Sequence, residues 1–192
     1  MLDTLTGLDT RLFFILNGSV VNPAFDGLFF LLTKKPILTA IAAAVWAFAF
    51  FVGSGRTRWF LLLGVIAFAA DDLIVYALKN AFARVRPCHF LGGVRLITEC
   101  PESYSFPSRH ASGLFSLSVT LVLGLKRYRV PLLAAAFMVA FSRVYSGVHY
   151  PGDVLAGAFL GSAVAFAVYF IDRRYQPGFF GRIKNFITHR EV

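Results

Sequence analysis

The chain has 192 residues, of which 57% are hydrophobic and only 15% are charged, and its mean hydropathy is +0.68. A soluble domain contains roughly 45–50% apolar and about 25% charged residues, so these proportions exclude an ordinary soluble protein. The formal net charge of +9 lies mainly in short stretches between or after apolar runs, as in membrane-flanking loops. We expect one membrane domain, residues 1–192, whose partners are membrane lipids and an anionic substrate rather than nucleic acid.

The first segment, residues 5–33, is apolar but repeatedly interrupted. The interrupting residues are Asn17, Gly18, Asn22, Pro23 and Asp26. We expect one or two interfacial helices within an N-terminal segment 1–35, and a sixth membrane span is the alternative. The first four residues lack a basic stretch followed by an apolar core, so we expect no cleavable signal peptide.

Five later segments are candidates to cross a bilayer, which takes about 20 residues of helix. They are residues 36–53, 59–78, 111–125, 130–148 and 154–171. The second contains Asp71 and Asp72, the third can be extended back to Ser108, and the fourth carries Arg143 near its end. The expected fold class is therefore all-α: a polytopic membrane helical bundle with five spans, plus the N-terminal interfacial helices or a sixth span.

With five spans, most basic loop residues fall on one side of the membrane. They are Arg56, Arg58, Lys126, Arg127, Arg129, Arg173, Arg174, Arg182, Lys184 and Arg190. The positive-inside rule makes this side cytoplasmic, including a basic tail at 173–192. The loop 79–107 and the turn at His149 then face the exterior, or the periplasm if this is a bacterial inner (cytoplasmic) membrane. Lys34 and Lys35 also fall on this outer face, against the rule.

Three groups of polar residues stand at span ends on the outer side. They are Lys79 with Arg84 and Arg86, Ser108 with Arg109 and His110, and Ser142 and Arg143 followed by His149 and Asp153. A single arginine at a membrane boundary is commonly an anchor that reaches the interface. That explanation does not account for two histidines, a serine and an aspartate at the same level, so we expect a phosphate-binding site.

The spacing within these groups predicts how they are presented. On a helix that continues past the second span, Lys79 and Arg86 share one face. Ser108 follows a proline and looks like a helix N-cap, where free N–H groups favour an anion. A proline at the first position of the last helix would place Asp153 in its first turn, within reach of the His149 ring. Such a carboxylate fixes the imidazole tautomer and supports a nucleophilic histidine.

The same groups resemble the signature of the type 2 phosphatidic acid phosphatase superfamily, which comprises membrane lipid phosphatases related to vanadium haloperoxidases and bacterial acid phosphatases. The matching elements are Lys79-x6-Arg86-Pro87, Pro107-Ser108-x-His110 and Ser142-Arg143-x5-His149-x3-Asp153. The resemblance covers the order and the internal spacing of all three parts. It implies a lipid phosphatase that uses no metal ion or other cofactor.

The resemblance also implies a role for each matching residue. His149 would attack phosphorus, Asp153 would orient it, and His110 would protonate the leaving oxygen and later activate water. The phosphoryl oxygens would be held by Lys79, Arg86, Ser108 and Arg143. Arg109 stands where the family usually has glycine, and it either contacts a second phosphate or faces solvent.

The substrate is less determined than the reaction. Small size, an external site and a resemblance to the undecaprenyl pyrophosphate phosphatases of this superfamily favour undecaprenyl diphosphate. Phosphatidylglycerol phosphate, phosphatidic acid and lipid A phosphates are alternatives, as is a phosphotransferase reaction. A transporter is the non-enzymatic alternative, because charged residues within spans can mark a transport path. The sequence makes no prediction of oligomeric state.

Two further pairs of residues leave alternatives open. Cys88 and Cys100, both in the outer loop, either form a disulfide, worth about 3 kcal/mol in the loop-entropy model, or remain free thiols. Asp71 and Asp72, inside the second span, are expected to be structural partners or a polar floor beneath the site rather than catalytic groups.

Overall fold

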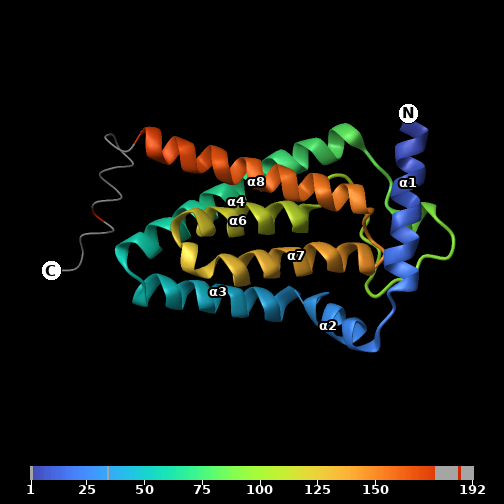
Figure 1. Cartoon of the computed structure of the whole chain (residues 1–192), viewed down its shortest axis with the longest axis horizontal. Coiled ribbons are helices and arrows are strands. Elements are labelled where there is room, and N and C mark those ends of the chain that lie inside the picture. The colour runs from blue at the N-terminus through green and yellow to red at the C-terminus, as the bar shows by residue number, and fades with distance from the viewer. Residues whose placement is uncertain (1, 34, 176–185, 187–192) are drawn as a thin grey trace.

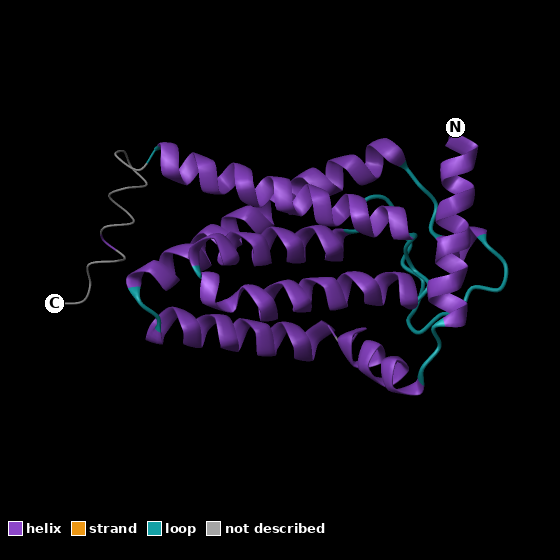
Figure 2. Ribbon diagram, in the orientation of Figure 1, coloured by secondary structure: helices purple, strands orange, loops and turns teal. Residues whose placement is uncertain are grey.

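The computed structural model describes residues 2–33, 35–175 and 186, and every regular element within them is helical (Figure 2). The elements are α1 (Leu2–Phe14), the π-helical turn η1 (Ile15–Ser19), α2 (Pro23–Thr33), α3 (Lys35–Val52), α4 (Gly55–Phe82), α5 (Pro87–Phe90), α6 (Arg109–Gly124), the 3-10 turn η2 (Lys126–Tyr128), α7 (Arg129–Tyr145) and α8 (Pro151–Arg174). The all-α class is confirmed, and each of the five predicted spans coincides with a helix.

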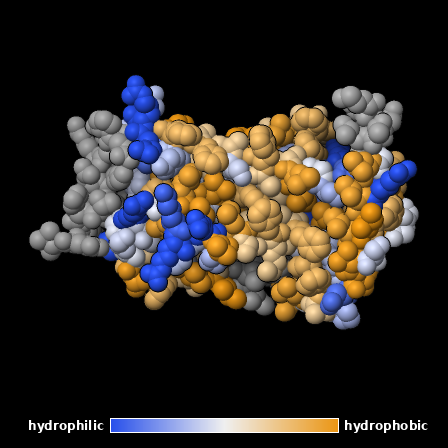
Figure 3. All heavy atoms as spheres, viewed as in Figure 1, coloured by the Kyte–Doolittle hydropathy of each residue, from blue (hydrophilic) through white to orange (hydrophobic). Residues whose placement is uncertain are grey.

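The long helices run side by side along the long axis of the molecule, and α1 crosses one end of the bundle (Figure 1). Apolar side chains cover the middle of the face shown in Figure 3, and most hydrophilic residues lie toward the two ends. This distribution fits a bundle with hydrocarbon around its middle.

The helices differ in whether they can cross a membrane by themselves. Two apolar stretches are long enough, Gly55–Phe90 and Pro151–Arg174. With 16 and 17 residues, α6 and α7 rise only about 24–26 Å, against a hydrocarbon thickness of about 30 Å. Length and composition thus support two spans, or three if a bent helix pair at the N-terminus counts as one. The arrangement with five spans stays a prediction.

The N-terminal segment forms two helical arms, Thr6–Ser19 and Pro23–Leu31, bent by 105°. Asn17 holds the bend by donating to the backbone oxygens of Arg95 and Tyr145, each at 2.8 Å. The Tyr145 hydroxyl in turn donates to Asp26 Oδ1 at 2.6 Å. The polar residues that make this segment a poor span therefore attach it to the 79–107 loop and to the end of α7.

Close packing of α6 against α8 brings the starts of these helices together. A Cβ at Gly157 would lie 2.7 Å from the Ser108 carbonyl oxygen, and one at Gly161 only 2.0 Å from that of Ser112. Glycines four residues apart are a common means of close helix approach in membranes. At the head of the pair, the Ser108 amide donates to the Asp153 carbonyl oxygen at 3.0 Å, so two of the three motifs are joined directly.

The other end of the bundle has its own apolar core around Trp59, Phe60 and Leu121. There the Trp59 indole donates to Asp172 Oδ1 at 3.2 Å. The starts of α4 and α7 and the end of α8, with their basic residues, lie at this end, opposite α1 (Figure 1). Most of the predicted basic tail 173–192, including Arg182, Lys184 and Arg190, falls outside the described residues.

Candidate active site

His149 lies in the turn between α7 and α8 and is only 2% exposed. Its Nδ1 is 3.4 Å from Oδ2 of Asp153, which is fully buried. Pro151 occupies the start of α8 and Asp153 its first turn, so the carboxylate reaches back to the ring as the spacing predicted.

The second ring nitrogen of His149 faces a cation. Nη1 of Arg86 lies 3.0 Å from His149 Nε2. A guanidinium can only donate hydrogen bonds, so Nε2 must accept and the ring hydrogen resides on Nδ1, toward Asp153. These contacts thus assign the tautomer that carries its hydrogen on Nδ1 and directs the Nε2 lone pair toward Arg86.

Burial sets the charge state of this ring. Desolvation lowers the pKa of His149 to about 4, and the positive charges of Arg86 and Lys79 act in the same direction. The hydrogen bond to Asp153 and its charge oppose the shift but do not outweigh burial. His149 is therefore neutral at pH 7, the state in which an imidazole is a nucleophile.

Asp153 is surrounded by donors besides His149. Ser105 Oγ donates to its Oδ2, the backbone amide of Tyr150 donates to the same oxygen at 2.9 Å, and Arg84 Nη1 donates to Oδ1 at 2.7 Å. Ser105 Oγ also lies 3.5 Å from His149 Nδ1. A carboxylate with this many donors is fixed in place.

Lys79 and Arg86 converge on the site by a different route from the one expected. The helix ends at Phe82, and Ala83 follows in the left-handed region at φ 45°. The expected common helical face is therefore wrong, because the backbone turns between the two cations. Both side chains are instead held by hydrogen bonds to the loop before α6.

Both cations donate their hydrogen bonds mainly to backbone carbonyl oxygens. Lys79 Nζ donates to the Ser105 carbonyl oxygen at 3.3 Å and also to that of Tyr104. Arg86 donates from Nε to the Ser103 carbonyl oxygen at 2.6 Å and from Nη1 to that of Val148 at 2.8 Å. Because no carboxylate forms these bonds, both side chains keep their positive charge available for an anion.

Ser108 and Arg143 are buried beside this group. Ser108 occupies the N-cap position of α6, but its side chain makes no capping hydrogen bond, which corrects the expected cap. Its Oγ is fully buried and has no partner among the described residues. A buried hydroxyl without a partner calls for a ligand or a water. Arg143 donates from Nε and Nη2 to Ser142 Oγ, at 3.1 and 2.9 Å.

The first turn of α6 carries the remaining predicted residues at its surface. His110 is exposed. Arg109, 62% exposed at its side chain, forms a two-pronged ion pair with Asp72 of α4, one prong measuring 2.7 Å. Asp71 is buried and accepts from Ser112 Oγ at 2.5 Å. Both aspartates thus have structural partners, as expected.

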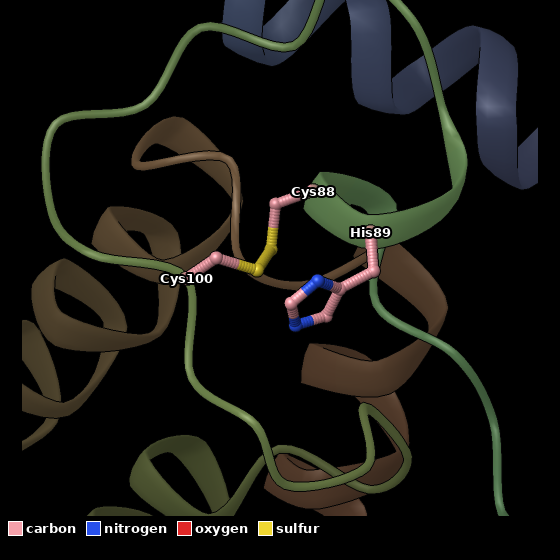
Figure 4. A group of neighbouring side chains, drawn as sticks. All are labelled: Cys88, His89 and Cys100. Carbon is pink, nitrogen blue, oxygen red and sulfur yellow. A yellow bond between two sulfur atoms is a disulfide. The ribbon is translucent and has the colours of Figure 1, made fainter.

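The 79–107 loop contains a disulfide between Cys88 and Cys100, with Cα atoms 6.1 Å apart. His89 lies beside it (Figure 4), and its Nε2 is 3.2 Å from the Pro101 carbonyl oxygen. The three side chains are close enough to suggest a metal site. Two sulfurs bonded to each other are not the thiolates that a metal requires. The cluster is therefore a structural cross-link of the loop.

Sequence reasoning did not assign a role to four residues that the structure brings to the site. They are Asp9, Arg84, Ser103 and Ser105. Arg84 was named in the first polar group without a role of its own, and Ser105 stands within a few residues of the second motif, which was a usable signal. Asp9 lies in α1, far from the motifs in sequence, and no local pattern marks it.

Comparisons with known proteins identify the family to which this chain is similar. A sequence model of the PAP2 superfamily matches residues 58–176. The chain is 38% identical over 112 residues to an undecaprenyl-diphosphatase of Sulfolobus acidocaldarius, covering 58% of this chain and only 54% of that protein, so it spans about half that relative's length.

Two further matches cover more of both chains. A lipid A 4'-phosphatase of Bacteroides thetaiotaomicron is 28% identical over 184 residues, covering 89% of this chain and 80% of that protein. The crystal structure of Aquifex aeolicus LpxE superposes with a TM-score of 0.72 at 26% identity, covering 85% of this chain and 95% of that one.

Proposed function

Because this chain belongs to the PAP2 superfamily and is a membrane lipid phosphatase, we propose that it releases phosphate through a phosphohistidine at His149, and that its substrate is undecaprenyl diphosphate. The observation that carries the mechanism is the buried ring of His149 between Asp153 and Arg86, where burial lowers its pKa and favours the neutral form. This arrangement supplies a nucleophile and a cation at the same point.

In the first step, Arg86 Nη1 transfers its hydrogen bond from His149 Nε2 to a phosphoryl oxygen of the substrate. The freed Nε2 attacks phosphorus, a P–N bond forms and the P–O bond to the lipid leaving group breaks. Asp153 stabilises the positive ring that results through its hydrogen bond to Nδ1. His110, exposed at the head of α6, donates a proton to the departing oxygen. The lipid leaves with that proton, and the phosphoryl group stays on His149.

In the second step, water replaces the histidine. His110, now neutral, takes a proton from the water as it attacks phosphorus. The P–N bond breaks, inorganic phosphate leaves and His149 returns to its neutral form. His110 thus acts first as acid and then as base, which restores both histidines at the end of each cycle.

Stabilisation of the phosphoryl charge falls to fixed donors. Phosphoryl transfer requires mainly positioning and charge neutralisation. We assign this role to Lys79, Arg86, Arg143 and the unpartnered hydroxyl of Ser108. These groups can supply the positive charge that Mg²⁺ supplies in other phosphoryl-transfer enzymes, so we propose a reaction that needs no added metal.

The undecaprenyl-diphosphatase relative, at 38% identity, supports a polyprenyl diphosphate substrate. Arg109, next to His110, would contact the second phosphate after release from Asp72. The lipid A 4'-phosphatase relative supports the main alternative, a lipid A phosphate. Phosphatidylglycerol phosphate, phosphatidic acid and a phosphotransferase reaction remain alternatives within the same chemistry. A transporter would give no reason for a neutral histidine held between a carboxylate and an arginine.

A phosphate-release panel on the purified protein tests the proposal. The panel compares undecaprenyl diphosphate, a lipid A phosphate, phosphatidylglycerol phosphate and phosphatidic acid, with and without EDTA. We expect the fastest release from undecaprenyl diphosphate, no effect of EDTA, and a loss of roughly 10⁴-fold or more in His149→Ala. His89→Ala, which changes an exposed histidine of the 79–107 loop, is the matched control and should retain activity.

Each part of the proposal can fail separately in this panel. Full activity of His149→Ala would rule out His149 as the nucleophile. Loss of activity with EDTA would rule out the metal-free mechanism. A faster reaction with another lipid would contradict the proposed substrate without contradicting the phosphohistidine mechanism. Arg109→Gly should slow release from the diphosphate more than from the monophosphates if Arg109 contacts a second phosphate.

A further inference from the structure

Arg84 bridges two carboxylates from distant parts of the chain. Its Nη1 donates to Asp153 Oδ1 at 2.7 Å and its Nη2 to Asp9 Oδ2 at 2.6 Å. The guanidinium also lies 4.0 Å from the centre of the Tyr150 ring. The side chain is 27% exposed, and it contacts the carboxylate that partners His149 rather than the ring itself.

Asp9 has a second contact with the same corner. Its Oδ1 accepts from the Gly152 amide at 2.7 Å, at the head of α8 between His149 and Asp153. A Cβ at Gly152 would lie 2.9 Å from Asp9 Oδ2, so a larger residue there would press on this contact. One carboxylate of α1 is thus tied to both the arginine and the turn that carries the candidate nucleophile.

We propose that Arg84 is a positioning residue for phosphoryl transfer, and that Asp9 couples helix α1 to the His149–Asp153 pair through it. This inference rests on the proposed function of His149. Arg84 fixes Oδ1 of Asp153, which leaves Oδ2 directed at His149 Nδ1. A two-pronged guanidinium held by a ring face and two carboxylates has little freedom to rotate, so the carboxylate it holds has little freedom either.

Arg84 also sets the charge felt by the His149 ring. The charged groups around the pair are Asp9 from α1, Lys79 from α4, Arg86 before α5, and Arg143 from α7. Arg84 partly neutralises Asp153, so its removal should strengthen the pull of that carboxylate on the ring proton and raise the pKa of His149. Removal of the Asp9 charge should act in the opposite direction.

Three variants separate charge from geometry. Arg84→Gln removes the charge and one prong, Arg84→Lys keeps the charge without the fork, and Asp9→Asn keeps the shape without the negative charge. Arg95→Gln is the matched control, because Arg95 is another arginine of the outer face that pairs with a carboxylate, Asp26, and lies by a tyrosine ring. All four are measured as full-length protein on the lipid phosphate that the wild type hydrolyses fastest.

We expect kcat to fall roughly 10²-fold in Arg84→Gln, with a smaller change in KM. The acid limb of kcat/KM should move to higher pH in Arg84→Gln, return in Arg84→Lys without full recovery of kcat, and move to lower pH in Asp9→Asn. A purely structural role would not give shifts of opposite sign in Arg84→Gln and Asp9→Asn. Arg95→Gln should match the wild type.

A second measurement needs no substrate. Carbethoxylation of His149 by diethyl pyrocarbonate, located by peptide mass spectrometry, should show the same displacement of its pH midpoint in Arg84→Gln. A wild-type kcat and an unmoved midpoint in Arg84→Gln would overturn the inference while the proposed function stands. Inactive wild-type protein, or an active His149→Ala, would overturn the proposed function instead, and the carbethoxylation midpoint would still decide whether Arg84 controls the ring.

Discussion

At the scale of single residues, the candidate nucleophile depends on two opposing effects on one imidazole. Burial removes the charged form of His149, and the nearby Asp153 partly restores it. Burial wins, so the ring is neutral, and its Nε2 lone pair faces Arg86, from which it accepts a hydrogen bond. The spacing of four residues between His149 and Asp153 made this pair visible in the sequence, because a histidine just before a helix and an aspartate in its first turn are local neighbours.

The lowered pKa of His149 predicts an acid limb at unusually low pH. The neutral ring is the reactive form, so activity should be lost as pH falls through about 4, well below the ordinary histidine value of 6.5. The measurement is kcat/KM against pH, corrected for ionisation of the substrate phosphate determined by ³¹P NMR. An acid limb near 6.5 after this correction would contradict the assigned environment of the ring.

At the scale of secondary structure, the site depends on how closely α6 approaches α8. Gly157 and Gly161 let the two backbones meet, and the heads of both helices then carry Ser108 and Asp153 into one group. The five apolar runs predicted the helices that form these elements. The contact between them was not predicted, since a glycine in an apolar run does not by itself name the helix it will face.

The close approach predicts an unequal response to the same substitution at two glycines. Gly161→Ala would place a Cβ 2.0 Å from the Ser112 carbonyl oxygen, so we expect a loss of about 1–3 kcal/mol and a melting temperature lower by about 2–4 °C for each kcal/mol. Gly27→Ala, in α2 with open space around it, should be neutral or slightly stabilising. Thermal unfolding followed by tryptophan fluorescence in detergent makes the comparison, and equal melting temperatures would contradict the packing.

At the scale of the whole molecule, the described basic helix ends and the candidate site lie at opposite ends of the bundle (Figure 1). The positive-inside rule then directs the basic end to the cytoplasm and the site, with its disulfide, to the exterior. We propose this orientation in a bacterial inner membrane. The N-terminal arms pack beside the 79–107 loop and would share its side of the membrane.

The native disulfide provides a direct test of this orientation, because Cys88 and Cys100 are the only two cysteines. A charged, membrane-impermeant phosphine followed by an impermeant maleimide should add two labels to the protein in right-side-out spheroplasts. Inverted vesicles should give none. Arg127→Cys, at the opposite end of the bundle, is the control and should gain one label in inverted vesicles only. The reverse pattern would place the site in the cytoplasm.

The sequence by itself determined the all-α class, the positions of the long helices and the residues of the three motifs. Those features are local, set by apolar runs of spanning length and by short spacings at helix ends. Only the tertiary structure decided how the motifs meet. The turn at Ala83 replaced the expected helical register, and the side chain of Ser108 does not cap α6. Arg109 pairs with Asp72, and Asp9 of α1 pairs with Arg84. Such contacts join residues far apart in sequence, and their geometry follows from helix packing and loop closure, which no local pattern encodes.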